Sequence, residues 1–177
     1  MSTEATIRVI SQHALGISDR AEVLRLCSDA FHCDYAPFLE ACTAAIHVLA
    51  SMDGQIVSHA LWITRWLQVG AGPLLRTAYV EGVATAPAYE RRGLATAVMQ
   101  TLQAQIADFD IGGLSPAQYR LYERLGWELW RGPLSARTAE GIIATPEEEA
   151  MILRLPRTPE IDLDAPLSVE WRAGEVW

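Results

Sequence analysis

The sequence predicts an α/β protein with a mixed β-sheet, formed by a single domain over residues 1–177. One observation is a pair of β-rich runs in residues 46–69 that flank Asp53-Gly54, the strongest short signal for an antiparallel hairpin. Another is that runs with strand and helix character alternate from residue 74 onward. The length of 177 residues, 50% of them hydrophobic, suits one domain with a sizeable core.

The first half of the chain is expected to begin with a strand at residues 6–10. Apolar residues at near-helical spacing predict a helix over 19–31, with Ser18 as its N-cap. A short helix is expected over 37–45, after Pro37. The two strands of the hairpin then complete this half.

The second half is expected to begin with a strand at 74–85. After Gly93, apolar residues repeat every four positions from Leu94 to Ile106, which predicts an amphipathic helix. Pro116 suits the first turn of a later helix. The remaining elements are expected to be a strand, a helix and two further strands, at 111–115, 116–125, 127–132 and 150–156.

Composition argues against several classes of protein. A formal charge of −8 and a pI of about 4.9 disfavour nucleic acid as a partner. The three cysteines include no CxxC pair, so neither a disulfide framework nor a metal site is indicated. The first residues lack a signal-peptide pattern, and no run approaches the ~18 apolar residues of a membrane span. We therefore expect a cytoplasmic protein with no membrane partner.

The most informative local pattern is ERRG at 90–93, where a strand leads into a helix. The first turn of a helix presents N–H groups without intrahelical partners, and the helix dipole favours an anion there. A glycine allows close approach and the arginines add positive charge, so the pattern predicts a pyrophosphate site. The GxxxxGK[ST] and GxGxxG patterns of nucleotide sites do not occur. The alternative is a basic, solvated helix start.

Several motifs carry a resemblance to a known family. VATAPAYERRGLATAV at 83–98 resembles the acyl-coenzyme A signature of the GNAT N-acetyltransferases. YVEG at 79–82, LYERLGW at 121–127, TPEEE at 145–149 and the final WRAGEVW resemble the aminoglycoside 2'-N-acetyltransferases within it. The resemblance implies a GNAT fold, with a mixed central sheet splayed at its middle and helices on both faces. It also implies acetyl-CoA as cofactor, a small-molecule aminoglycoside substrate and a homodimer.

The resemblance further implies which residues bind the cofactor. Glu90 stands where the family usually has Arg or Gln. This weakens the side-chain contact with the pyrophosphate, while the backbone N–H groups can still bind it. The N–H of Val83 is implied to bind the thioester carbonyl as an oxyanion stabiliser. The expected cofactor-binding set is Val83, Ala84, Thr85, Glu90, Arg91, Arg92, Gly93, Leu94 and Ala95.

Three residues are expected to be catalytic. Glu81 is an acid inside an otherwise apolar strand, next to Gly82, where a bulge is typical. It is expected to accept a proton from the amine through water, the alternative being an exposed acid on an edge strand. The resemblance implies that Tyr122 is the general acid for the departing thiolate, the alternative being core packing. The α-carboxylate of Trp177 is expected near the substrate.

Acidic residues dominate the expected acceptor site, as suits a polycationic aminoglycoside. Thr145 and Glu148 have an alternative role as a capping box at a helix start, and Ser115 has one as a turn or N-cap residue. The expected substrate-binding set is Asp34, Glu81, Gly82, Ser115, Glu147, Glu148, Glu175 and Trp177.

The acceptor region departs from the family pattern at two places. Cys33-Asp34-Tyr35 stands for Gly-Asp-Phe, and Ala44-Ala45-Ile46-His47 stands for Gly-Gly-Met-His. We therefore expect an altered pocket, with kasugamycin or an aminoglycoside of the gentamicin and tobramycin class as the acceptor. The alternatives are a GNAT enzyme for another amine, such as a polyamine or a protein N-terminus, and a non-catalytic acyl-CoA-binding module.

Overall fold

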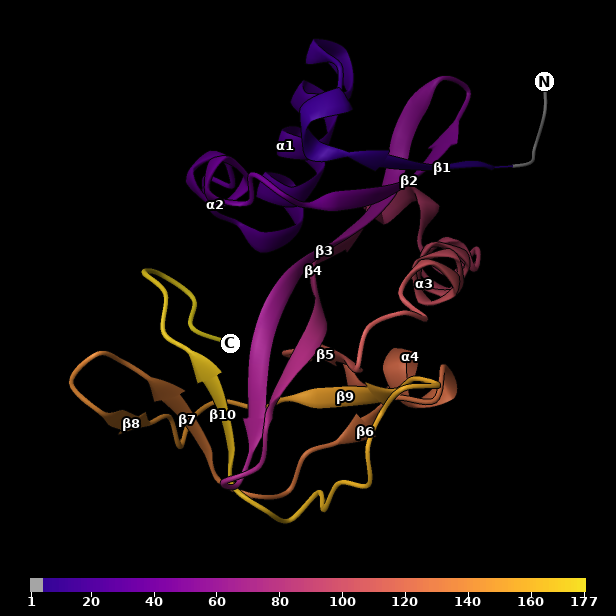
Figure 1. Cartoon of the computed structure of the whole chain (residues 1–177). Helices are drawn as coiled ribbons and strands as arrows, with labels where there is room; N and C mark the ends of the chain where they lie inside the picture. The colour runs from indigo at the N-terminus through magenta and orange to yellow at the C-terminus, as the bar shows by residue number, and fades with distance from the viewer. Residues whose placement is uncertain (1–4) are drawn as a thin grey trace. The chain divides into compact units, whose positions relative to one another are not determined.

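The computed structural model describes residues 5–177, which form two compact units (Figure 1). The first unit comprises the chain up to residue 63 together with residues 80–105. The second comprises residues 64–79 and 106–177. Strands β3 (Gln55–Val69) and β4 (Leu74–Thr85) contribute to both units.

The first unit contains an antiparallel sheet in which β2 pairs with both β1 and β3. The hairpin between β2 and β3 turns at Asp53 and Gly54, whose φ values are 50° and 81°, as the sequence predicted. The ladder contains an irregularity between Ala50 and Ser51. The elements of this unit, besides its parts of β3 and β4, are β1 (Thr6–Ser11), η1 (Gln12–Ala14), α1 (Ile17–Phe31), α2 (Ala36–Ala41), β2 (Ile46–Met52), η2 (Pro87–Tyr89) and α3 (Leu94–Gln105).

Helices cover both faces of this sheet, as expected (Figure 1). Helices α1 and α2 pack on one face, where Leu26 and Leu39 share a core cluster with Leu49 of β2. Helix α3 packs on the other face, where Leu94 joins Met52. Helix α3 also follows the predicted apolar repeat of four residues. The sheet therefore lies between two helical layers within this unit, with β2 mostly buried and β1 at its exposed edge.

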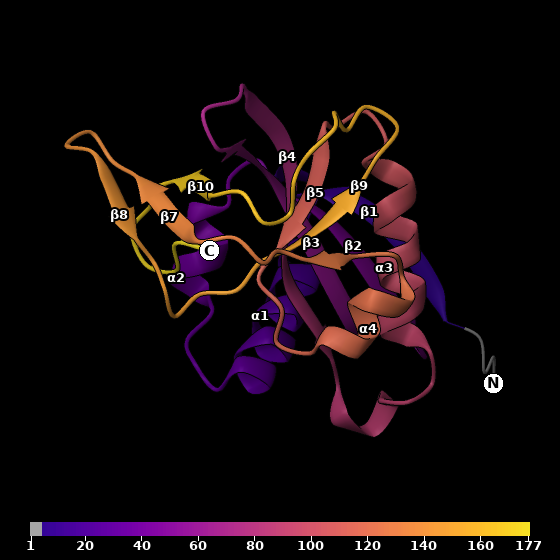
Figure 2. The same ribbon diagram turned by 90° about the horizontal axis from the view of Figure 1, so that it is seen from below.

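The second unit is a mixed sheet in which the strands follow the order β6, β9, β5, β4, β3, β10, β7 and β8. The pairs β4–β5 and β7–β10 are parallel. The β4–β5 ladder runs from Thr77 to Tyr79, after which β4 continues to Thr85. Figure 2 shows β10 beside the β7–β8 hairpin. The remaining elements are β5 (Ile111–Leu114), α4 (Tyr119–Arg124), β6 (Glu128–Leu129), β7 (Leu134–Arg137), β8 (Ile142–Ala144), β9 (Met151–Arg154) and β10 (Leu167–Glu170).

Several local predictions were wrong. Ser18 is inside α1, which begins at Ile17 with Gly16 at its N-cap. Pro116 precedes α4, which begins only at Tyr119, so the turn after β5 is longer than expected. The strand expected over 127–132 is reduced to β6, and β7, β8 and β10 were not predicted at all. No helix within residues 5–177 is long and apolar enough to cross a membrane.

Candidate active site

The ERRG turn of the first unit leads directly into α3. Arg91 and Gly93 have φ values of 58° and 78°. The left-handed conformation costs a non-glycine residue such as Arg91 roughly 1–2 kcal/mol, so the turn is a strained feature. Arg91, Arg92 and Gly93 are exposed, whereas Leu94 is buried and fixes the start of the helix in the core.

This turn has the form of an anion site. A Cβ at Gly93 would meet no atom within 4 Å, so the main chain is open on that side. The N–H groups of the first helical turn, among them those of Leu94 and Ala95, have no intrahelical acceptor. The first turn of α3 contains no acidic residue that would repel an anion. The turn therefore fits the pyrophosphate of coenzyme A, with Arg91 and Arg92 adding charge and the exposed Glu90 opposing it.

The end of β4 carries the predicted catalytic acid. Glu81 is half-buried, and Gly82 has a φ of 61°, so the strand is irregular where a bulge was predicted. After Val83 the strand is anchored again, because the Ala84 carbonyl accepts a hydrogen bond from the Ser58 hydroxyl at 3.1 Å. The Thr85 hydroxyl also lies 2.8 Å from that of Ser58. The main chain that directly follows the irregular segment is thus held by Ser58.

A chain of side chains, of which the two histidines are buried and Gln12 is half-buried, supports the Gly82 carbonyl. His59 Nδ1 lies 2.7 Å from that oxygen, and His59 Nε2 lies 2.9 Å from His47 Nδ1. His47 Nε2 in turn lies 2.6 Å from the Gln12 side-chain oxygen, and the Gln12 amide donates to the Leu39 carbonyl at 2.9 Å. Burial lowers the pKa of His59 to about 3 and that of His47 to about 4. Sequence reasoning missed this chain, since these histidines share no metal-binding spacing.

In the second unit, Tyr122 is buried in α4. Its ring makes an edge contact with Trp127, with the ring centroids 6.3 Å apart. Burial raises the pKa of the Tyr122 hydroxyl to about 12, so the phenol is protonated at neutral pH and can act as a donor. Both predicted roles for Tyr122, core packing and proton donation, are compatible with this position.

The tail of the second unit is anchored by side chains from other segments. Trp177 is 3% exposed, and its indole N–H donates to the Thr145 hydroxyl at 2.8 Å. Arg65 of β3 is 2% exposed and donates to the main-chain oxygens of Val176 at 2.5 Å and Glu170 at 2.6 Å. Burial lowers the pKa of the Arg65 guanidinium, which the Glu170 carboxylate at 3.3 Å partly offsets. Sequence reasoning missed Arg65; a lone arginine within the apolar run of β3 was the available signal.

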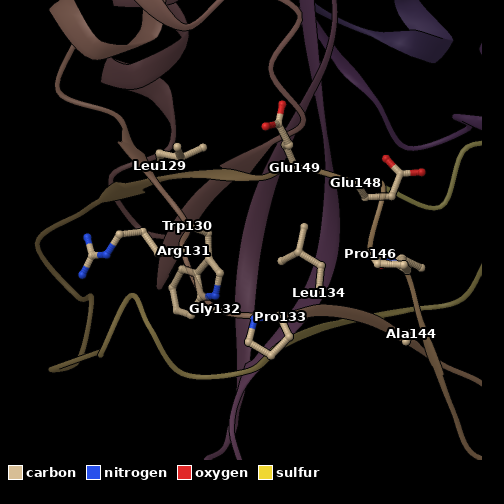
Figure 3. A pocket seen from close by; sticks show the side chains of 11 residues that line it. Leu129, Trp130, Arg131, Gly132, Pro133, Leu134, Ala144, Pro146, Glu148 and Glu149 are labelled. Carbon is tan, nitrogen blue, oxygen red and sulfur yellow. The ribbon is translucent and has the colours of Figure 1, made fainter.

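The TPEEE segment lines a cavity of about 390 Å³ in the second unit (Figure 3). No helix begins at Thr145, so the capping-box alternative for Thr145 and Glu148 is wrong. A turn at 146–147 brings Glu148 and Glu149 to the cavity wall, and the Tyr119 hydroxyl donates to Glu149. The apolar part of the wall includes Trp130 and Leu134. The sequence had led us to select Glu147, which does not line the cavity, and to pass over Glu149, which does.

The other predicted acceptor-binding residues are exposed. The Asp34 carboxylate accepts the Ala36 N–H at 3.0 Å and so supports the start of α2. Ser115 directly follows β5, and the Glu175 carbonyl accepts a hydrogen bond from Arg172. Within the second unit, the structure brings Trp177 to Thr145, the first residue of the TPEEE segment.

An irregular strand that carries an acid, followed by a glycine turn at a helix start, is the arrangement that the sequence led us to expect of an acyl-CoA-dependent N-acetyltransferase. The family model described as an acetyltransferase (GNAT) domain matches residues 13–130, and the chain belongs to this family. The protein is therefore an N-acetyltransferase, and acetyl-CoA is its acetyl donor.

Known proteins with similar sequences or structures extend this finding. The chain is 29% identical to an aminoglycoside 2'-N-acetyltransferase from Mycolicibacterium fortuitum, over 97% of this chain and 92% of that protein. Its fold resembles that of the GNAT family N-acetyltransferase YhbS from Escherichia coli in complex with CoA. That match has a TM-score of 0.67 and 18% identity, over 95% of this chain and 91% of the other. Eis1 from Mycobacterium abscessus matches with a TM-score of 0.63 and 20% identity over 75% of this chain, which spans only 33% of Eis1.

Proposed function

We propose that this enzyme transfers the acetyl group of acetyl-CoA to the 2'-amino group of an aminoglycoside. The observation that carries the proposal is the similarity to the M. fortuitum enzyme over 97% of this chain. The cavity beside Trp130 supports it, because Glu148 and Glu149 offer negative charge to a cationic sugar. The net charge of −8 acts in the same direction over longer distances.

In this proposal, the first unit provides the groups that bind the donor and accept the proton. When bound, acetyl-CoA supplies an activated thioester. The N–H groups from Arg91 to Ala95 would hold its pyrophosphate, and the main chain from Val83 to Thr85 would bind its pantetheine part. The Val83 N–H stabilises charge on the thioester oxygen. Glu81 removes a proton from the acceptor amine through a water molecule, leaving the amine free to attack.

The second unit provides the proton donor and further acceptor-binding groups. Tyr122 donates its hydroxyl proton to the departing thiolate, and burial keeps that hydroxyl protonated at neutral pH. In this unit the residues proposed to bind the acceptor are Ser115, Glu147, Glu148, Glu175 and Trp177. In the first unit they are Asp34, Glu81 and Gly82. The Thr145 hydroxyl fixes the orientation of the Trp177 indole.

The acceptor is proposed to be kasugamycin or a member of the gentamicin and tobramycin class. Segment 33–47 differs from the glycine-rich pattern of the family. Two of its residues, Ala45 and His47, are buried, with exposed fractions of 1% and 0%. Restoring the glycine-rich residues there should change the ratio of kcat/KM values among acceptors. An unchanged ratio would show that the segment does not select the acceptor.

The proposal also includes a homodimer in the cytoplasm. Ile142 and Ile143 of the outer strand β8 are 72% and 54% exposed, an apolar edge that suits self-association. Light scattering of the purified protein at several concentrations tests the dimer directly, and Ile143→Lys should shift the mass toward the monomer.

The decisive experiment measures thiol release from acetyl-CoA with kasugamycin, gentamicin, tobramycin, spermidine and a peptide. We expect release with at least one aminoglycoside, and mass spectrometry with NMR should locate the acetyl group on the 2'-amine. Release with spermidine or the peptide alone would make this a GNAT enzyme for another amine. No release with any amine, while acetyl-CoA still raises Tm, would make it a non-catalytic acyl-CoA-binding module.

A further inference from the structure

Tyr35 lies in the core of the first unit, at the junction between α1 and α2. Its ring stacks on Phe31 with centroids 5.7 Å apart and lies 5.0 Å from the ring of Phe38. The side chain is only 6% exposed and belongs to the cluster that packs the two helices on the sheet. Packing alone would be met equally well by a phenylalanine, because these contacts involve only the ring.

The hydroxyl of Tyr35 has no hydrogen-bond partner among residues 5–177. Buried polar groups in folded proteins are almost always paired, because an unpaired one loses its bonds to water without replacement. Burial also raises the pKa of this hydroxyl, and the negative charge of Glu81 raises it further. The group is therefore a neutral phenol with a proton to donate.

This hydroxyl is directed at the irregular segment of β4. A Cβ atom placed on Gly82 would lie 2.4 Å from the Tyr35 oxygen and 3.1 Å from His59 Cε1. Only glycine fits between these two side chains, and Gly82 also has a φ of 61°. The unpaired hydroxyl thus touches the residue that follows the proposed catalytic acid, Glu81.

We propose that the Tyr35 hydroxyl is a hydrogen-bond donor to the acceptor and helps to select it. This inference rests on the proposed function and adds a residue to it. The acceptor atom that fits is a hydroxyl or ether oxygen of an amino sugar, next to the amine that Glu81 deprotonates. A simple polyamine lacks such an oxygen and leaves the phenol unpaired. The exposed residues 32–34 begin with the left-handed His32 at the end of α1 and directly precede Tyr35, so they are the segment that would have to move for an acceptor to reach the hydroxyl.

The test compares wild type with Tyr35→Phe, which keeps the ring and removes the hydroxyl. Because an unpaired group is removed, Tm of the free variant should rise by about 2–4 °C. For the aminoglycoside, kcat/KM should fall about tenfold, the size expected for one buried hydrogen bond. The KM for acetyl-CoA should not change. Tyr89→Phe removes the hydroxyl of another tyrosine of this unit, in η2, and should leave the aminoglycoside kinetics as in wild type.

Each result has a definite meaning. A lower Tm for Tyr35→Phe would show that the hydroxyl is paired within the protein and would overturn the proposal, whatever the substrate. An unchanged kcat/KM for an aminoglycoside that wild type acetylates would overturn it as well. If wild type acetylates only spermidine, the proposed function fails. If Tyr35→Phe then lowered kcat/KM for spermidine threefold or more, the proposal that Tyr35 recognises a sugar oxygen would be overturned as well.

Discussion

The two units build their candidate groups in different ways. In the first unit, the irregular segment at Gly82 and the turn at Gly93 lie close together along one strand–turn–helix, and we propose that they act through main-chain N–H groups. In the second unit, Trp177, Thr145 and Arg65 come from separate segments, and side-chain bonds between residues up to 111 positions apart hold them. A main-chain site depends on backbone conformation at a few positions. A side-chain site depends on every partner, so substitutions should have different signatures in the two units.

The largest effect on activity is expected at Glu81, which is proposed to act through its side chain rather than its main chain. Glu81→Gln should lower kcat by about 10²–10⁴ because the proton acceptor is lost, while the acetyl-CoA affinity stays unchanged. Single-turnover acetyl transfer measures this. Glu40→Gln alters another acid of the same unit, on α2 and 69% exposed, and should retain wild-type kcat. A loss of less than threefold for Glu81→Gln would exclude a catalytic role.

The second unit should lose the most stability when its buried cation is removed. Arg65→Met breaks the bonds to Val176 and Glu170 and should lower the free energy of unfolding by about 3 kcal/mol. Urea unfolding measures this, and limited proteolysis should detect release of the tail. Arg131→Met is the matched control, since the Arg131–Asp164 pair is mostly exposed and its loss should change stability much less. Equal losses for the two variants would contradict the anchoring role of Arg65.

The histidine pair makes the first unit sensitive to acid. The folded-state pKa values of His47 and His59 lie below the unfolded value of 6.5, so the folded state resists protonation. The associated stability is complete above pH 6.5 and is lost as the pH falls toward 4. Between pH 6.5 and pH 5 the loss should be about 2 kcal/mol per histidine. Urea unfolding across this range measures it.

Two variants isolate the contribution of the pair. His59→Asn should flatten the dependence of stability on pH, whereas His13→Gln, at an exposed histidine of the same unit, should not. Parallel profiles for all three proteins would mean that folding does not lower the pKa values of the pair.

The smallest effect should come from Gly93→Ala, which tests the main-chain site itself. An alanine at a φ of 78° costs about 1 kcal/mol, and the strain should disturb the N–H groups that we propose to bind the pyrophosphate. We expect the Kd for acetyl-CoA to rise about tenfold. Gly54→Ala imposes a similar strain in the β2–β3 turn, at a φ of 81°, and should lower stability without changing that Kd. If the two variants had the same Kd for acetyl-CoA, the turn at Gly93 would have no role in binding the pyrophosphate.

Sequence could predict the parts that depend on neighbours along the chain. Asp53 and Gly54 adopt the positive φ values of a tight hairpin turn, and the ERRG turn precedes α3 as predicted. These features follow from backbone preferences of a few adjacent residues. The positions of Glu81 and Gly82 on an irregular strand could be predicted for the same reason, although their catalytic roles remain predictions.

The rest depends on distant partners. Thr145 was given a capping box as its alternative, but its hydroxyl accepts the indole N–H of Trp177 instead, and the local pattern is overridden. Strand β10 was not predicted because its pairing partners, β7 and β3, lie far away in sequence. Tyr35 reads from sequence as one more core aromatic residue. Only its unpaired hydroxyl against Gly82 distinguishes it.

The anchoring of the tail by Arg65 also has a consequence for the synthesis of the protein. The ribosome makes Arg65 111 residues before Val176, its most distant acceptor. At roughly 5–20 residues per second, that interval is on the order of ten seconds. During this interval the Arg65 guanidinium remains hydrated, because the main-chain oxygens of Glu170 and Val176 that later replace its water molecules have not yet been synthesised. The part of β3 around Arg65 is therefore translated early but can be buried only among the last steps of folding.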